Sequence, residues 1–170
     1  IPPELGSPPI NSIFERSSAG EQIAGDIAKR ITTNGGAALI IDYGHVRHGL
    51  GDTLQAVKSH KYHDALATIG EADLTAHIDF AALENAAKAS GAIVHGPVFQ
   101  GGLLTALGIE QRTEVLAATA TPDQAEILES ASRRLIAADG MGTLFKAMAI
   151  TSVADSTPAG FEGYAVESVS

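Results

Sequence analysis

A short apolar run at residues 37–41 (AALII) most constrains the fold, because it follows a helical pattern and a glycine turn. Apolar side chains recur at helical spacing over about residues 18–32, which begin with Ser18 and Glu21 in the spacing of a capping box. An Asn-Gly-Gly turn at 34–36 then stops the helix. Apolar and β-branched residues after such a turn are typical of a strand buried on both faces. Together these features predict an α/β sheet.

The rest of the chain is expected to add helices and two further strands. Residues 43–78 hold several glycines and no clear period, so we expect an irregular connection with one short extended piece at 73–78. Asp79 is a good N-cap for the next helix. Three strands make a thin sheet for 170 residues, unless further strands lie outside the chain. The remaining predicted elements are helices over about 80–90, 99–107, 109–118 and 122–138, and strands over 92–95 and 143–150.

The composition argues against several classes of function. The chain has 20 acidic and 11 basic residues, and a net charge of −9 disfavours a nucleic-acid surface. It has no cysteine, which excludes disulfides, zinc-thiolate sites and thiol nucleophiles. No apolar run approaches the roughly 18 residues that a membrane span needs. We therefore expect no nucleic-acid or membrane partner, and a location in the bacterial cytoplasm or, alternatively, the mitochondrial matrix.

A carboxylate, a phenol and a glycine follow the first predicted strand directly. Ligands usually bind at the carboxyl ends of strands in an open α/β sheet, and we expect Asp42, Tyr43 and Gly44 at that place. A carboxylate there can bind a guanidinium or an amine, and a phenol can orient a polar substrate. The alternative is structural, with Asp42 capping nearby backbone and Gly44 permitting a turn.

Four further residues are candidates for the same site. Asp52 and Thr53 could reach it through the irregular loop, although an Asx turn explains Asp52 as well. Asp79 could also reach it, but its position as a helix cap explains it fully. Gln100 precedes two glycines that allow close approach either by a ligand or by another helix.

The six histidines include two HxxH pairs, His45 with His48 and His60 with His63. Two imidazoles at this spacing can bind a metal when they lie on a helix. Neither pair lies in a predicted helix, and no glutamate follows as in HExxH, so we expect solvated loop histidines and no metal. The sequence also lacks a Walker loop, a GxSxG elbow and a dinucleotide GxGxxG motif.

Five segments, in unbroken order between about Ser17 and Ile150, resemble one known family. They are IIDYG, GDTLQA, ADLTAHIDF, HGPVFQGGLLTALGI and MGTLFKAMAI. They look like the carboxyl-terminal half of the MidA-type S-adenosylmethionine-dependent methyltransferases, a family that includes the mitochondrial complex I assembly factor methyltransferase.

The resemblance implies a class I methyltransferase fold, which is a Rossmann-like sheet with a helical insertion. Residues 17–150 would form the C-terminal part of that domain, the strand near Asp42 would be its fifth, and the final strand would be antiparallel. The insertion would span about 99–138. Residues 1–16, which hold four of the seven prolines, would be a linker or mid-protein loop, and residues 151–170 a tail.

The resemblance also implies S-adenosylmethionine as cofactor and a protein arginine as methyl acceptor. The family's glycine-rich cofactor loop has no match here, so we expect the remainder of the methyltransferase domain to complete the pocket. Asp42, Tyr43 and Asp52 are the candidate catalytic residues, and Gly44, Thr53, Asp79 and Gln100 the candidate substrate-binding residues. None of them is assigned as general base.

Two other functions stay open at this point. A non-catalytic assembly or scaffold module could present the helices at 99–138 to a protein partner, and a homo-oligomer is compatible with the sequence. A metal-dependent hydrolase could use the HxxH pairs.

Overall fold

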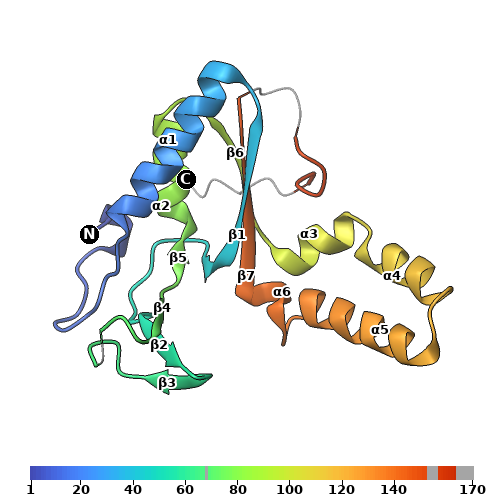
Figure 1. Ribbon diagram of the computed structural model, residues 1–170. Coiled ribbons are helices and arrows are strands. Elements are labelled where there is room, and N and C mark those ends of the chain that lie inside the picture. Colours follow the sequence, from blue (N-terminus) through green and yellow to red (C-terminus); the bar gives the residue numbers. More distant parts are fainter. Residues whose placement is uncertain (68, 153–156, 164–170) are drawn as a thin grey trace.

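The computed structural model describes residues 1–67, 69–152 and 157–163, and its centre is a mixed four-stranded sheet (Figure 1). The strand order is β5-β1-β7-β6, and two helices cover one face of the sheet. This arrangement confirms the predicted α/β class. The strands of this sheet are β1 (Ala37–His45), β5 (Ile78–Asp79), β6 (Ile93–Phe99) and β7 (Phe145–Thr151).

Strand β7 lies between β1 and β6 and runs antiparallel to both. Its pairing with β1 extends from Ala37 opposite Thr151 to Tyr43 opposite Phe145. Its pairing with β6 is antiparallel as well. The predicted antiparallel last strand is therefore confirmed, while β1 and β6 point the same way. On the outer edge of β1, the described residues pair only near its end, where β5 lies parallel to it.

Helices α1 (Ser18–Asn34) and α2 (Phe80–Ala89) pack on one face of this sheet and bury their apolar sides. The cap of α1 is Ser17 rather than Ser18, since the Ser17 hydroxyl accepts a hydrogen bond from the Gly20 amide at 3.1 Å. Asp79 caps α2, as predicted. The main core is formed by buried residues of the helices, the strands and their connections, namely Ala24, Ala28, Ile31, Phe80, Leu83, Ala87, Ala92, Met148 and Ile150.

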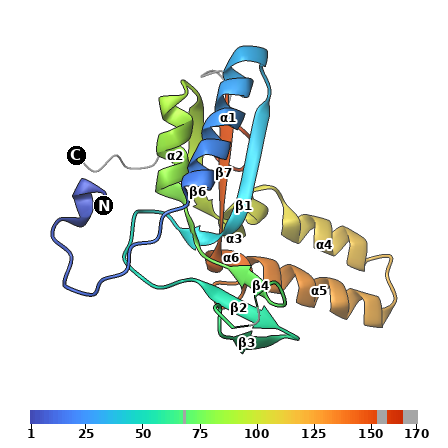
Figure 2. The same cartoon turned by 60° about the vertical axis from the view of Figure 1, so that its left-hand side comes forward.

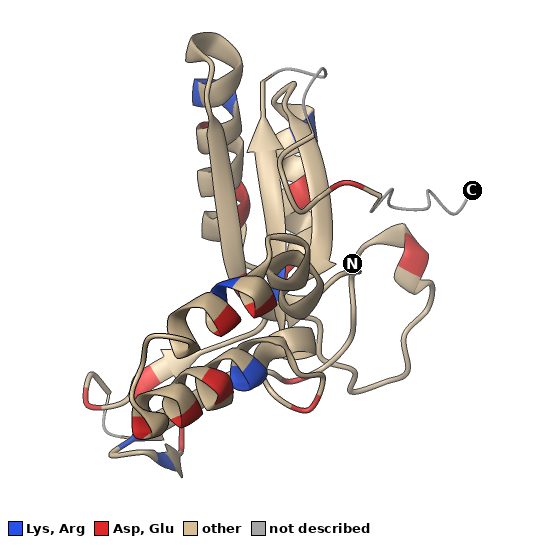
Figure 3. Ribbon diagram, turned by 90° about the vertical axis from the view of Figure 1, so that its right-hand side faces the viewer, with Lys and Arg blue, Asp and Glu red and all other residues tan. Residues whose placement is uncertain are grey.

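The predicted helical insertion lies between β6 and β7 and begins with α3 (Gln100–Ala106). Helices α4 (Ile109–Ala117) and α5 (Pro122–Ile136) follow as a hairpin that projects away from the sheet (Figures 1 and 2). Neither of these two helices has a buried residue, and charged side chains of both signs lie along them (Figure 3). The predicted strand at 143–150 starts later than expected, because α6 (Met141–Leu144) precedes β7.

The expectation of an irregular connection over 43–78 was wrong in two respects. Strand β1 continues to His45, and a second, three-stranded antiparallel sheet follows it. Its strands have only three or four residues, and Ala56 is their one buried residue, so they carry almost no alternating pattern. The short elements outside the main sheet and its helices are η1 (Pro3–Leu5), β2 (Gln55–Lys58), β3 (Lys61–His63) and β4 (Asp73–Thr75).

A smaller apolar cluster contains Val98, Leu103, Ala147, Ala149 and Phe161, which join β6, β7, α3 and residues 157–163. In the parts of the chain that the structure describes, no helix is both long enough and apolar enough to cross a membrane.

Candidate functional site

The carboxyl end of β1 is the place where the amino-terminal ends of two helices meet. Helix α1 precedes β1, and α2 precedes β6, which is parallel to β1, so both helices begin at this edge of the sheet. Open α/β sheets bind ligands at this edge. A cavity of about 720 Å³ lies here, and its polar lining includes Glu15, Arg16, Glu21, His48, His77 and Asp79.

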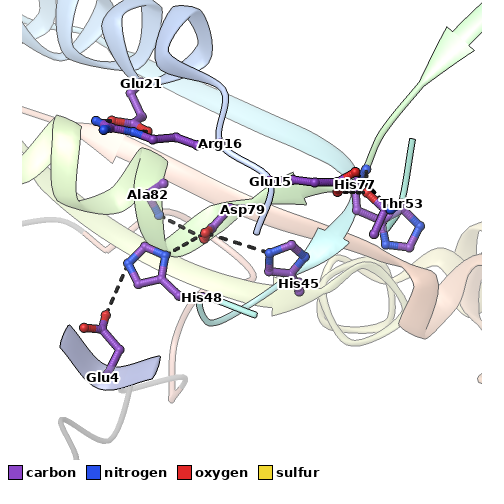
Figure 4. A network of polar contacts seen from close by, with 10 residues as sticks. All are labelled: Glu4, Glu15, Arg16, Glu21, His45, His48, Thr53, His77, Asp79 and Ala82. Atoms are coloured by element: carbon purple, nitrogen blue, oxygen red, sulfur yellow. Dashed lines mark hydrogen bonds and ion pairs between the residues drawn. The ribbon is translucent and has the colours of Figure 1, made fainter. Parts of the chain in front are cut away.

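Asp79 is the centre of the polar contacts at this cavity (Figure 4). One carboxylate oxygen accepts a hydrogen bond from the Ala82 amide at 3.1 Å, which caps α2. The other lies 2.6 Å from Nδ1 of His48 and 3.8 Å from Nε2 of His45. The side chains of Asp79 and His48 are only 12% and 10% exposed. Burial and two-sided hydrogen bonding fix the position of this carboxylate.

The second ring nitrogen of His48 points away from Asp79. Nε2 lies 3.3 Å from a carboxylate oxygen of Glu4, which belongs to η1 and is exposed. An ionised Asp79 accepts hydrogen bonds only, so it favours the His48 tautomer with the proton on Nδ1. The Glu4 carboxylate is likewise an acceptor only, so each ring nitrogen of His48 faces a carboxylate oxygen.

Glu15 joins the segment before α1 to the loop after β1. Its carboxylate accepts hydrogen bonds from the amides of Thr53 and Leu54, both at 3.0 Å, and from the Thr53 hydroxyl. The same hydroxyl accepts a hydrogen bond from the His77 amide at 2.9 Å. Burial alone would raise the pKa of Glu15, but these hydrogen bonds outweigh it and hold the pKa below its ordinary value.

Glu21 and Arg16 form a bidentate ion pair on the cavity wall (Figure 4). Nε and a terminal nitrogen of Arg16 each donate to a different oxygen of Glu21, both at 2.7 Å. The hydrogen bond from Arg16 lowers the pKa of the Glu21 carboxyl, and the same contact raises the pKa of Arg16. The Glu21 side chain is 21% exposed and that of Arg16 is 65% exposed.

A second cavity of about 300 Å³ lies beside the first, and its lining includes Tyr43, Thr53, Tyr62, Thr75 and His77. The ring of Tyr43 packs edge-on against His77, with 5.5 Å between the ring centroids. Because His77 lines both cavities, they share one wall.

The structure separates the three predicted residues of β1 from the larger cavity. Asp42, Tyr43 and Gly44 lie inside the strand and not beyond its end, because pairing with β7 continues to Tyr43. Asp42 accepts a hydrogen bond from the Tyr43 amide at 2.8 Å. A Cβ on Gly44 would lie 2.1 Å from the Ile78 carbonyl oxygen, so the close pairing of β1 with β5 requires glycine.

The other four candidates lie in different places. Thr53 and Asp79 contribute to the network around the larger cavity. Asp52 is exposed beside Thr53. Gln100 is buried in the helical insertion, where its Nε2 donates to the Leu135 carbonyl at 3.0 Å and ties the start of α3 to α5. The functional roles of all seven candidates stay predictions.

Sequence reasoning missed Glu15, Arg16, Glu21 and His48 as parts of one site. Glu15 and Arg16 lie within the predicted linker at 1–16, and the capping-box spacing at the start of the first helix accounts for Glu21 on its own. The expectation of a solvated loop histidine was wrong for His48, which is largely buried. The HVRH spacing was the available signal, but it suggested a metal. In the described ranges, no group of three or more His, Cys, Asp or Glu side chains could hold a metal ion.

Three carboxylates and a glycine-containing turn lie at this end of the sheet. The carboxylates of Glu15, Glu21 and Asp79 line the cavity. The turn from β6 into α3 contains glycines, but a Cβ on Gly101 would lie 2.5 Å from the Ile136 carbonyl oxygen, so this turn is closed by packing. Gly101 is therefore required for helix packing and leaves no room there for a ligand.

Comparisons with known proteins identify one family of methyltransferases. Residues 4–98 match the model of an S-adenosyl-L-methionine-dependent methyltransferase family. The chain is 43% identical over 141 residues to the mitochondrial protein arginine methyltransferase NDUFAF7 homolog of Drosophila melanogaster. It is 38% identical over 129 residues to the mitochondrial protein arginine methyltransferase NDUFAF7 of Danio rerio. The matches cover 82% and 75% of this chain but 32% and 30% of those relatives, so the chain spans about a third of their length.

Solved structures of two superfamily members from Burkholderia thailandensis have the same fold. An uncharacterized member has a TM-score of 0.69 at 27% identity, over 87% of this chain and 39% of the other. A member bound to S-adenosyl-homocysteine has a TM-score of 0.63 at 27% identity, over 84% of this chain and 37% of the other. The family model covers more than half of the residues, and the fold agrees with it. The chain therefore belongs to the family of S-adenosyl-L-methionine-dependent methyltransferases.

Proposed function

We propose that this chain forms the acceptor side of a protein arginine methyltransferase. The observation that carries the proposal is the cavity at the carboxyl end of β1, where Glu15, Glu21 and Asp79 line one space and Glu21 already binds a guanidinium bidentately. Carboxylates recognise the planar guanidinium in this way. The names of the curated relatives support the same acceptor.

The residues of the chain would act mainly by positioning. Bound S-adenosylmethionine supplies an electrophilic methyl group. A carboxylate that holds the guanidinium in one plane would fix the orientation of the attacking nitrogen, which is the main demand of such a transfer. The transfer would break the bond between the methyl group and sulfur and leave S-adenosylhomocysteine, and the nitrogen would have to lose a proton as its new bond to carbon forms. His48 would take this proton at Nε2 once the Glu4 carboxylate has moved away from that atom, while Asp79 holds its Nδ1–H.

The rest of the methyltransferase domain would complete the cofactor pocket. Along β1 the described residues pair with the outer edge only at Gly44 and His45. On the face turned away from α1 and α2, Leu39 and Ile41 are 56% and 44% exposed. We propose that the remaining strands pair with this edge and that further helices of the domain cover the exposed apolar face.

Methyl transfer by the full-length protein tests the proposed function. The protein is incubated with labelled S-adenosylmethionine and two peptides that differ only in having Arg or Lys at one position. We expect label on the arginine peptide and on its guanidinium nitrogen by mass spectrometry. Equal labelling of both peptides, or labelling of the lysine peptide alone, would contradict an arginine site.

The roles of Asp42, Tyr43 and Asp52 in catalysis remain part of the proposal. Tyr43 has the strongest support of the three, because it lines the smaller cavity and packs against His77. Replacing it by Phe keeps the ring and removes the hydroxyl. A loss of turnover in Tyr43→Phe with unchanged folding would support a polar contact with the substrate, and full activity would exclude one.

The source compartment and the acceptor protein are also proposals. Relatives named as mitochondrial support the mitochondrial matrix, and the structures from a bacterium are compatible with the bacterial cytoplasm. In a mitochondrion, the acceptor that the family resemblance implies is a subunit of complex I. Methylation of that subunit in extracts that contain or lack the protein would test this assignment.

A partner-binding role is a second candidate, supported by the hairpin of α4 and α5. Val115 and Ile127 on these helices are 71% and 67% exposed. Two such hairpins could pack into a four-helix bundle, so the occupant we propose is a second copy of the chain. Light scattering of the full-length protein should give the mass of a dimer, and Val115→Asp with Ile127→Asp should give that of a monomer. An unchanged mass would contradict this interface.

A further inference from the structure

We propose that the Glu21 carboxylate binds the guanidinium of the acceptor arginine, and that Arg16 occupies this carboxylate until the substrate displaces it. The inference rests on the arginine acceptor proposed above and assigns its binding to one carboxylate. Arg16 would then act as a built-in competitor of the substrate.

The geometry of the pair is that of a guanidinium binding site. Two parallel hydrogen bonds of 2.7 Å join Nε and a terminal nitrogen of Arg16 to both oxygens of Glu21. Glu21 is fixed on the first turn of α1, whose amino-terminal end favours a negative charge. Its side chain is mostly buried and lines the cavity. An external arginine side chain could make the same two bonds from within the cavity.

The other cavity carboxylates lack such an exchangeable partner. Glu15 accepts hydrogen bonds from the Thr53 and Leu54 amides, which are fixed parts of the loop. Asp79 accepts from the Ala82 amide and contacts the buried His48. Freeing either carboxylate would leave backbone donors without partners, which is costly. Among these three carboxylates, only Glu21 is held by a side chain that can rotate away.

Arg16 is suited to leave its position. Its side chain is 65% exposed, and Glu21 is its one hydrogen-bonding partner within the described ranges. Ion pairs with an exposed partner add little to stability, because water solvates the charge almost as well. Water can therefore solvate the guanidinium of Arg16 after a substrate arginine has replaced it at Glu21.

Two substitutions with opposite expected effects test this inference in the full-length protein. Arg16→Ala removes the competitor, so the KM for an arginine peptide should fall severalfold with kcat unchanged. Glu21→Gln removes the negative charge that binds the guanidinium, so KM should rise roughly tenfold or more, the usual effect of losing charge-assisted hydrogen bonds. The double variant should behave like Glu21→Gln.

The ion pair of Lys88 and Glu84 on α2 is a matched control. Its side chains are 55% and 15% exposed, close to the values of Arg16 and Glu21. Lys88→Ala and Glu84→Gln should leave KM unchanged. If Arg16→Ala raises KM, or if both cavity variants leave it unchanged, the pair is only structural and the inference is wrong.

Calorimetry of peptide binding separates this inference from the proposed function. If the full-length protein does not methylate arginine at all, the proposed function is wrong, but binding of the arginine peptide can still be measured. Arg16→Ala should bind it more tightly than the wild type and Glu21→Gln more weakly. If the arginine peptide binds neither the wild type nor Arg16→Ala, Glu21 is not the residue that binds the acceptor guanidinium. Thermal unfolding of each variant checks that the fold is retained.

Discussion

At the scale of single residues, the site depends on contacts between segments that are far apart in the sequence. Glu15 bonds to Thr53 and Leu54, 38 and 39 residues away, and His48 contacts Asp79 over 31 residues. A sequence read along its length could identify Asp79 as a helix cap from its neighbours, but it held no local sign of its second role. A capping pattern depends only on residues close in sequence, so it revealed the role of Asp79 as a helix cap but not its contact with His48.

Glu15 should make stability depend on pH. Its pKa is lowered in the folded protein, so its contribution is present above the pKa of the unfolded chain and is lost as pH falls through the lower folded value. We expect Glu15→Gln to lower the free energy of unfolding by about 1–3 kcal/mol at neutral pH. Urea unfolding at neutral and acidic pH measures the difference, which should shrink below the folded pKa. A constant difference would show that ionisation of Glu15 is irrelevant.

Gly44 should be intolerant of any side chain. A Cβ would lie 2.1 Å from the Ile78 carbonyl oxygen, so Gly44→Ala must separate β1 from β5. We expect a destabilisation of about 1–3 kcal/mol or more, the usual range for overpacking. Gly49→Ala is the control, since its Cβ would meet nothing closer than 3.9 Å. Equal midpoints of chemical unfolding for the two variants would contradict the close approach.

At the scale of elements, the accuracy of prediction followed the length and burial of each element. Helices α2 and α5 were predicted well because caps and periodic apolar faces mark them. Strands β2, β3 and β4 are short and mostly exposed, so hydrophobic alternation could not reveal them. The end of β1 was placed too early because Asp42 looked like the first polar residue after a strand, whereas pairing with β7 continues beyond it.

The capping box should keep the first turns of α5 helical. The Thr121 side chain accepts from the Gln124 amide, and the Gln124 side chain accepts from the Thr121 amide. Since α5 buries no residue, little packing compensates for a lost cap. Thr121→Ala should cost about 1 kcal/mol and speed amide hydrogen exchange in the first turns of α5. Exchange in β7 should stay the same, and a uniform acceleration across both elements would contradict a local effect.

At the scale of the whole molecule, the sheet has one well-covered face and one incomplete edge. Ala38 and Ile40 are partly buried against the core formed with α1 and α2, while Leu39 and Ile41 on the opposite face are exposed. The chain spans about a third of its curated relatives, and the thin sheet agrees with a larger domain. The small number of predicted strands indicated a thin sheet, but it could not indicate which edge of the described sheet would be unpaired.

One pair of substitutions tests whether the exposed face of β1, which carries Leu39 and Ile41, is covered in the full-length protein. Leu39 and Ile127 are similarly exposed here, at 56% and 67%. If the rest of the domain packs on the face of β1 that is turned away from α1 and α2, Leu39→Asp should destabilise the full-length protein by about 2 kcal/mol or more, since it buries a charge. Ile127→Asp on α5 should have little effect on unfolding of the monomer. Equal effects on the unfolding midpoint would argue against covering of β1.

The central claim is that the cavity at the carboxyl end of β1 receives the arginine acceptor. The most direct measurement is single-turnover methyl transfer to an arginine peptide by the full-length Asp79→Asn variant, with Glu129→Gln on α5 as the control. We predict a loss of roughly 100-fold or more in rate for Asp79→Asn, because His48 loses its carboxylate partner and general acid–base catalysis commonly supplies such a factor. The control should keep the wild-type rate. A wild-type rate for Asp79→Asn, with its fold intact, would contradict the claim.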